Sequence, residues 1–170
     1  MITTILWGSI VAGGLAVMQS TLLRFAAIAG VQPDLVLIVV IFLANKNGSM
    51  VGQVVGFLAG LVLDIMGLAP LGFYALIYTV SGAVFGLTRG KMFLDPVFLP
   101  LLFGVVAVLV KGLLGLLVAT LFSIDPVSAR LFSGRFLIEI GYTAILVPVL
   151  FGLLGLARAL QPDPRKGEVL

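Results

Sequence analysis

The sequence predicts an all-α, polytopic membrane bundle of about six transmembrane helices. Of its 170 residues, 61% are hydrophobic and only 10% are charged, whereas a soluble domain has about 45–50% apolar and about 25% charged residues. A soluble fold of this length could not bury so much apolar surface, so lipid must surround the chain. The apolar residues also form runs separated by short polar or Gly- and Pro-containing breaks, which is typical of membrane-spanning helices.

Six apolar runs are the candidate spans. They are residues 4–23, 34–45, 50–66, 71–88, 97–122 and 136–157. Five are long enough to cross about 30 Å of hydrocarbon at about 1.5 Å per residue. The second has only ten uninterrupted apolar residues, Leu35 to Ala44, so it is either a short span or a re-entrant segment. We expect residues 1–160 to form one transmembrane domain and residues 161–170, with two prolines and four charged residues, to be a short disordered tail.

Basic residues set the expected orientation, because cytoplasmic loops of membrane proteins are enriched in Lys and Arg. With six spans, one side carries Lys46, Arg89, Lys91, Arg158, Arg165 and Lys166, and the other carries Arg24, Arg130 and Arg135. A re-entrant second segment would move only Arg24 to the first side, so the count does not choose between the two topologies. Both place the loops at 46–50 and 89–96 and the C-terminal tail in the cytoplasm, and six spans place the N-terminus there too.

Composition excludes several kinds of active site. The chain has no Cys and no His, which rules out a thiolate or imidazole metal site, a Cys nucleophile and a Ser-His relay. An aspartyl intramembrane protease needs two facing carboxylates, and we expect Asp64 to be the only Asp deep within a span. The ten Lys and Arg residues are scattered along the chain, which indicates topology rather than nucleic-acid binding. We therefore expect no enzyme and no cofactor.

Two series of glycines fall at intervals of four residues, which return to nearly the same helix face. The third span carries Gly48, Gly52, Gly56 and Gly60, and the fourth carries Gly82, Gly86 and Gly90. Each series removes side chains from one stripe and allows another backbone to approach closely. Two interpretations stay open. The stripes pack the helices of this bundle together, or the third-span stripe, as the longer one, docks the transmembrane helix of a partner.

Three ionisable residues, Asp64, Lys111 and Glu139, lie inside predicted spans. A charge at the centre of a membrane helix costs about 2.5–3.5 kcal/mol even on the lowest scales, so such residues usually face the protein interior. Counting about 1.5 Å per residue places all three in the outer half of the membrane. We expect Lys111 to pair with Asp64 or Glu139. Two alternatives are that the carboxylates contact interfacial water while Lys111 extends outward, or that the three residues serve ligand binding or proton transfer.

Short motifs follow one another in the first half of the chain. They are Gln19 near the end of the first span, Pro33-Asp34-Leu35 at the start of the second, Gly60-Leu61-Val62-Leu63-Asp64 in the third, and Pro70-Leu71-Gly72 at the start of the fourth. Proline suits the first turn of a helix, and a neighbouring Asp favours the positive helix end. Capping alone can therefore explain Pro33 and Asp34.

Over residues 18–86 these motifs resemble the MreD family of bacterial rod shape-determining membrane proteins. The family pattern includes a Pro-Asp-Leu start, a glycine-spaced helix that ends in an aspartate, and a Pro-Leu-Gly restart at matching intervals. The second half resembles the family only in length, hydropathy and a short basic tail. The resemblance therefore implies no role for Lys111 or Glu139.

This resemblance implies a non-enzymatic scaffold or regulator of the elongation machinery in the bacterial cytoplasmic (inner) membrane, which helps position side-wall peptidoglycan synthesis and maintain rod shape. It implies an MreC-like bitopic partner, indirect association with MreB, RodA and the elongation penicillin-binding transpeptidase, and contact with membrane lipids. MreD-like proteins are also thought to share the helix arrangement of substrate-binding subunits of energy-coupling-factor transporters. The alternative function is thus a membrane-embedded small-molecule (vitamin-type) binding subunit. The small number of polar groups expected at the outer end argues against it.

Overall fold

The computed structural model describes residues 2–21, 27, 30–67, 70–89, 98–121 and 134–157. The helices of this part are α1 (Ile2–Thr21), α2 (Leu35–Asn47), α3 (Ser49–Met66), α4 (Phe73–Gly86), α5 (Phe98–Leu121) and α7 (Gly134–Leu156). Each helix end lies within two residues of the predicted span end, so the predicted all-α membrane bundle is confirmed. The predicted tail at 161–170 lies outside the described residues.

The helices fall into two length classes. Four of them, α1, α3, α5 and α7, contain apolar stretches long enough to cross a membrane. The other two are shorter apolar helices, with 13 residues in α2 and 14 in α4. At about 1.5 Å per residue, α2 and α4 are each about 20 Å long, which is less than the hydrocarbon thickness of about 30 Å. Both short helices therefore need neighbours that satisfy their ends within the bundle.

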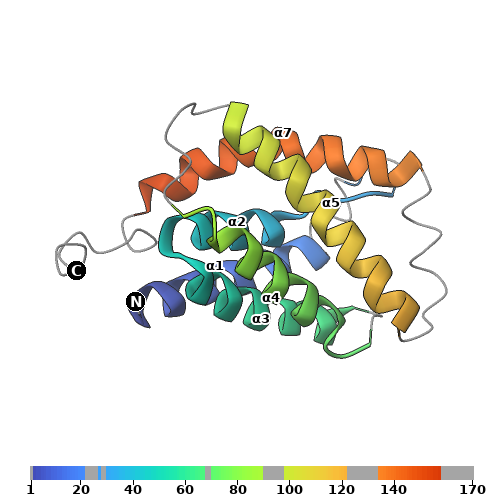
Figure 1. Ribbon diagram of the computed structural model, residues 1–170, viewed down its shortest axis with the longest axis horizontal. Helices are drawn as coiled ribbons and strands as arrows, with labels where there is room; N and C mark the ends of the chain where they lie inside the picture. Colours follow the sequence, from blue (N-terminus) through green and yellow to red (C-terminus); the bar gives the residue numbers. More distant parts are fainter. Residues whose placement is uncertain are drawn as a thin grey trace.

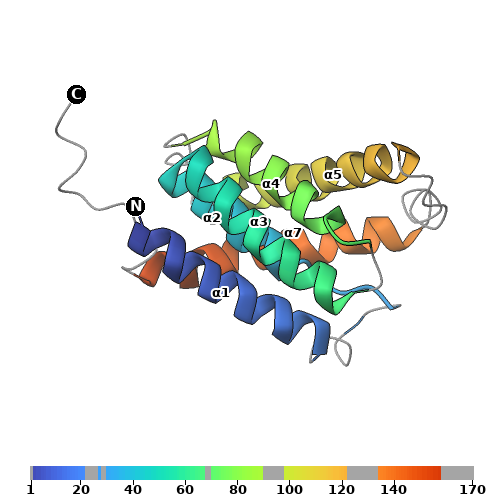
Figure 2. The same cartoon turned by 90° about the horizontal axis from the view of Figure 1, so that it is seen from below.

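Successive helices run in opposite directions along the bundle (Figures 1 and 2). α1, α3 and α5 run away from the end of the bundle at which α1 begins, and α2, α4 and α7 return to it. α2 thus ends where α1 and α3 begin. This alternation favours six crossings over a re-entrant second segment, and it brings the start of α1 and the end of α7 to the same end of the bundle.

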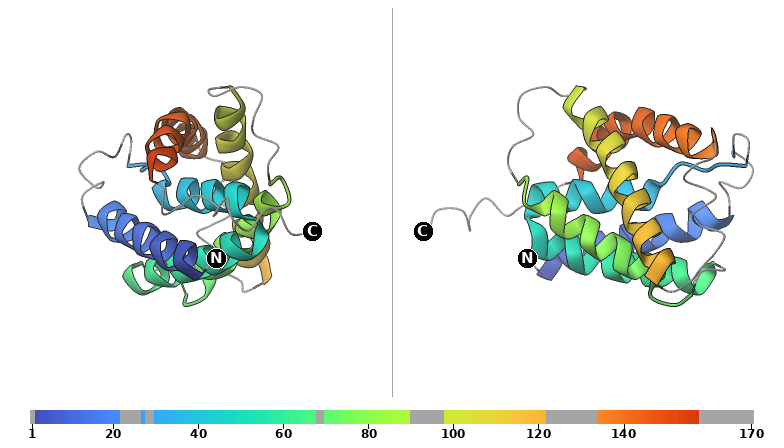
Figure 3. Two further views of the ribbon diagram at one scale, coloured as in Figure 1. Left: turned by 90° about the vertical axis from the view of Figure 1, so that its left-hand side faces the viewer. Right: turned by 45° about the vertical axis from the view of Figure 1, so that its right-hand side comes forward.

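α2 is the central helix of the bundle (Figure 3). Every residue from Leu35 to Asn45 is buried, and the main apolar core is built around this helix. Because α2 is shorter than its neighbours, it begins inside the bundle, and the non-helical residues 30–34 lead into it. Non-helical backbone at membrane depth is stable only when protein or a water-filled cavity surrounds it.

The two glycine stripes pack against each other and hold α3 and α4 together. The facing positions are Gly52 with Gly82, Gly56 with Tyr78, Gly60 with Ala75, and Gly86 with Ser49. At each of these glycines a Cβ atom would overlap the backbone of the opposite helix, so only glycine permits this approach. The structure thus supports the packing interpretation. The third-span stripe is covered by α4, and at Gly52 also by Ala44 of α2, so it leaves no open face for a partner helix.

The remaining stripe glycines differ from these. Gly48 joins α2 to α3 with a φ of +95°, a left-handed backbone conformation that favours glycine. Gly48 therefore forms the turn between α2 and α3 and is not part of the α3 packing face. Gly90 lies outside the described residues.

α5 and α7 form a second packing unit. They contact each other extensively and reach the other helices mainly through α2 and α4. Gly104 of α5 lies against Ala144 and Val147 of α7, so this pair also approaches closely. The polar contacts that join the α5–α7 pair to α2 and α4 therefore decide how the two parts of the bundle are held together.

Candidate functional site

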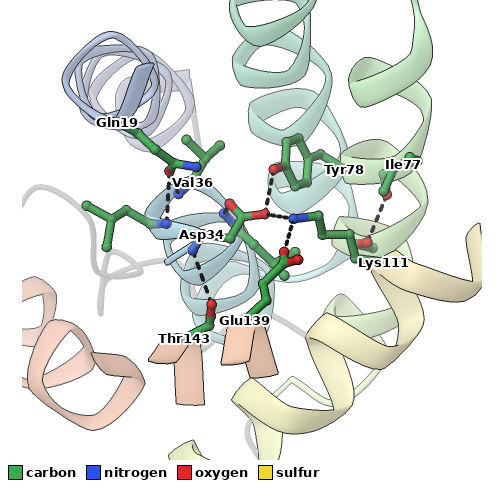
Figure 4. A network of polar contacts seen from close by, with 11 residues as sticks. Gln19, Asp34, Val36, Ile77, Tyr78, Lys111, Glu139 and Thr143 are labelled. Atoms are coloured by element: carbon green, nitrogen blue, oxygen red, sulfur yellow. Dashed lines mark hydrogen bonds and ion pairs between the residues drawn. The ribbon is translucent and has the colours of Figure 1, made fainter. Parts of the chain in front are cut away.

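The first N–H groups of α2 need hydrogen-bond acceptors because this helix begins inside the bundle. The side-chain Oε1 of Gln19, on α1, accepts hydrogen bonds from the N–H groups of Leu35 at 3.0 Å and Val36 at 3.4 Å. Oδ1 of Asp34 accepts a hydrogen bond from the N–H of Leu37 at 2.9 Å, which makes Asp34 the N-cap of the helix. The motif residues thus satisfy the buried start of α2 (Figure 4).

Asp34, itself buried, also belongs to an ion triad whose other two members, Lys111 and Glu139, are partly buried. Its Oδ2 lies 2.5 Å from Nζ of Lys111 on α5, and the same Nζ lies 2.6 Å from Oε1 of Glu139 on α7. The hydroxyl of Tyr78 on α4 donates to Oδ2 of Asp34 at 2.7 Å, and the N–H of Asp34 donates to Oγ1 of Thr143 on α7 at 3.1 Å. This network therefore ties the start of α2 to α4, α5 and α7 (Figure 4).

The burial of Asp34 determines how strongly the triad affects the stability of the bundle. The side chain of Asp34 is 1% exposed and that of Lys111 is 19% exposed, so little water reaches the paired oxygen. A buried ion pair adds little stability over an apolar replacement, but removal of one partner leaves a charge that nothing compensates and is strongly destabilising. The intact triad therefore fixes α5 and α7 relative to α2, and a broken triad opposes their packing.

Two of the three ionisable residues selected from the sequence come together. Lys111 meets Glu139 as expected, and it turns into the bundle instead of extending outward. Asp64 does not pair with Lys111, and its place as the second carboxylate is taken by Asp34. Asp34 is as buried as Asp64, although it precedes its helix instead of lying deep within a span.

Asp64 instead caps α4. Its Oδ2 accepts hydrogen bonds from the N–H groups of Gly72 at 2.9 Å and Ala75 at 3.1 Å, and its Oδ1 accepts one from Tyr74 at 2.8 Å. Gly72 has a φ of +95°, and this left-handed turn directs the backbone N–H groups towards the carboxylate. The carbonyl oxygen of Pro70 accepts a hydrogen bond from Phe73. The motif from Asp64 to Gly72 is therefore a capping unit for the second short helix.

The sequence reasoning missed two members of the network, Tyr78 and Thr143, and the ionic role of Asp34. Thr143 follows Glu139 by four residues and so lies on the same face of α7, a spacing that could have identified it. Asp34 could have been placed by depth, because it lies 12 residues before Lys46 and hence about 18 Å from that end of the helix. No comparable signal distinguishes Tyr78 from an ordinary core tyrosine. Pro33, which precedes Asp34, is buried and has no N–H to satisfy.

A cavity of about 370 Å³ adjoins the network on the side away from α2, and a second hollow of about 320 Å³ shares several of its lining residues. The larger cavity is lined by Gln19, Gly30, Val31, Gln32, Phe73, Tyr74, Ile77, Lys111, Gly112, Gly115, Arg135, Phe136 and Glu139. Six of these residues carry polar or charged side-chain groups. The expectation that few polar groups converge at this end of the bundle is therefore wrong.

The described part of the chain holds no group of three His, Cys, Asp or Glu side chains that could bind a metal ion. The carboxylates of Asp34 and Asp64 are both engaged, one with Lys111 and Tyr78 and the other with the start of α4. Carboxylates that are bound in this way fix helix positions. An aspartyl protease would instead need two carboxylates that face one substrate-binding space.

Comparison with models of known protein families matches residues 1–156 to the family of the rod shape-determining protein MreD. The matched range contains all six described helices, so it extends through the second half, where the motifs were sparse. No curated protein and no solved structure matches the chain, and the likeness to transporter subunits stays a prediction. The chain belongs to the MreD family, and it is a multi-pass, non-enzymatic rod shape-determining membrane protein of the cell elongation machinery.

Proposed function

We propose that this chain is a scaffold of the elongation machinery in the bacterial inner membrane, which binds an MreC-like bitopic protein directly. Through that partner it would act on MreB, RodA and the elongation penicillin-binding transpeptidase during side-wall peptidoglycan synthesis. The observation that carries the proposal is the family match across all described helices. The interior supports it, because the buried polar groups bind one another and fix helices.

A bitopic partner contributes one transmembrane helix, which has to pack on the lipid-facing surface of the bundle. We do not assign its docking face to the α3 stripe, because α4 lies against Gly52, Gly56 and Gly60. Large apolar side chains face outward on all five peripheral helices, and examples are Ile10, Phe57, Leu76, Leu113 and Leu153. These positions sample the faces to which the partner helix could bind.

Disulfide crosslinking tests this proposal directly, since the chain contains no native cysteine. Single cysteines at Ile10, Phe57, Leu76, Leu113 and Leu153 would be combined with single cysteines along the transmembrane helix of the MreC-like protein. We expect crosslinks at one of these positions or at two on neighbouring helices, because one partner helix can contact only adjacent faces. Val40→Cys on α2, which is 0% exposed, is the control and should not crosslink. Absence of crosslinks at all five positions would contradict direct binding to this partner.

We further propose that both chain termini are cytoplasmic. The start of α1 and the end of α7 lie at one end of the bundle. Lys46, in the last turn of α2, and Arg89, which follows α4, lie at the same end. Basic residues favour the cytoplasmic side. Reporter fusions at the N- and C-termini should both report the cytoplasm, whereas an external N-terminus with a cytoplasmic C-terminus would refute six crossings.

A further inference from the structure

The cavity beside the ion triad exists because the central helix is short. α2 begins at Leu35 within the bundle, and residues of α1, α4, α5 and α7, together with residues 30–32 before α2, line the space beyond its start. At about 370 Å³, the cavity lies within the size range of sites for small molecules, about 300–1,000 Å³. Its occupant must therefore match the charges on its walls.

Within the described part of the chain, the cavity wall carries polar and charged groups whose hydrogen-bonding capacity is only partly used. Glu139 uses Oε1 to bind Lys111, and no other described residue donates a hydrogen bond to this carboxylate. Gln19 uses its Oε1 to cap α2, which leaves its amide N–H groups available. Lys111 has three N–H donors, and two of them are directed to Asp34 and Glu139. The cavity thus presents one carboxylate oxygen that can accept a hydrogen bond, together with several donors.

The charge distribution points to a ligand that carries both signs. Asp34, Lys111 and Glu139 together carry one negative charge, so the cavity wall is negative beside Glu139. Arg135 supplies a positive charge, but it lies exposed at the rim and forms no ion pair with Glu139, although the two lie four residues apart on α7. Residues at this spacing have Cβ atoms about 5–6 Å apart. A site for a cation at Glu139 and a site for an anion at Arg135 therefore lie one helical turn apart along the cavity wall.

We propose that this cavity binds a small zwitterionic group, with a primary ammonium at Glu139 and an anion at Arg135 and Gln19. The spacing of one turn suits an ammonium and a phosphate separated by two carbons. Two sources provide this chemistry: the headgroup of phosphatidylethanolamine, which can reach a cavity among membrane-spanning helices, and a free zwitterion such as phosphoethanolamine. The inference does not depend on the partner proposed above.

Lipid retention measured by native mass spectrometry tests the proposal. The full chain in detergent would be incubated with phosphatidylethanolamine, phosphatidylcholine or phosphatidylglycerol of equal acyl chains. We expect phosphatidylethanolamine to be retained about tenfold better than either of the others, a factor that corresponds to about 1.4 kcal/mol. Phosphatidylcholine has no N–H to donate to Glu139, and phosphatidylglycerol has no cation. A thermal shift with phosphoethanolamine alone would assign the site to the free zwitterion, and its absence with retained lipid preference would assign it to the lipid.

Matched variants locate the site. Glu139→Gln and Arg135→Gln should each abolish the preference, whereas Arg89→Gln, an exposed arginine beyond α4, should preserve it. Because Arg135 is exposed, its variant should fold even if Glu139→Gln does not. Equal retention of the three lipids without a phosphoethanolamine shift would overturn the proposal, as would a preference that survives Arg135→Gln.

Discussion

Replacement of Lys111 with methionine is expected to lower the free energy of unfolding by about 3–5 kcal/mol, the usual loss when one partner of a buried ion pair is removed. Methionine keeps the length of the side chain, so packing changes little. The variant leaves Asp34, 1% exposed, without its counter-ion, and Glu139 loses the same partner. The measurement is unfolding in mixed detergent and denaturant micelles, followed by circular dichroism.

Arg89→Met, an exposed basic residue that follows α4, is the control and should change stability by less than about 0.5 kcal/mol, as surface substitutions usually do. An equally small effect of Lys111→Met would show that Asp34 does not depend on the lysine charge. The triad would then be a consequence of helix packing rather than a contributor to it.

The second large effect is expected from Gly56→Leu. A Cβ at Gly56 would overlap the carbonyl group of Tyr78, so α3 and α4 would have to separate. Overpacking of a fitted interface costs about 1–3 kcal/mol or more, and here backbone atoms rather than flexible side chains must move. We expect reduced abundance of the protein in membranes and faster proteolysis, with partner binding lost together with the folded protein.

Gly152→Leu on α7 provides the matched control for this change. Nothing lies within 4 Å of a Cβ at Gly152, and the position is exposed, so the added side chain should extend into lipid with little loss of stability. If Gly56→Leu accumulates normally and loses only its partner, the stripe is a docking face after all. Such a result would contradict the packing of α3 on α4.

The helix bounds could be predicted from the sequence because hydropathy changes sharply at each membrane boundary. The central position of α2 could not be predicted. A run from Leu35 to Ala44 that is apolar on every face fits both a short span and a helix enclosed by protein. Only the packing of the other helices on it distinguishes the two. Because α2 starts inside the bundle, Asp34 at its start lies beside Lys111.

The candidate site was predictable only in part. Lys111 and Glu139 were identified because charges within apolar runs need partners. Asp64 is a helix cap rather than an ion-pair partner, and Asp34 is both, because depth alone cannot separate an ion-pair partner from a helix cap. Asp64 becomes a cap through the left-handed turn at Gly72, which brings the start of α4 back to the end of α3. Such a return of the chain depends on tertiary structure.

The ion triad fixes the α5–α7 pair relative to α2. A double-mutant cycle is the most direct test of this role. Unfolding free energies would be measured for the unmodified protein, Asp34→Asn, Lys111→Met and the double variant. Because Oδ2 of Asp34 and Nζ of Lys111 are 2.5 Å apart, we expect the two losses to be non-additive by at least about 1 kcal/mol, with the double variant more stable than the sum predicts. Losses that add to within about 0.5 kcal/mol would show that the two residues act independently and would contradict this account.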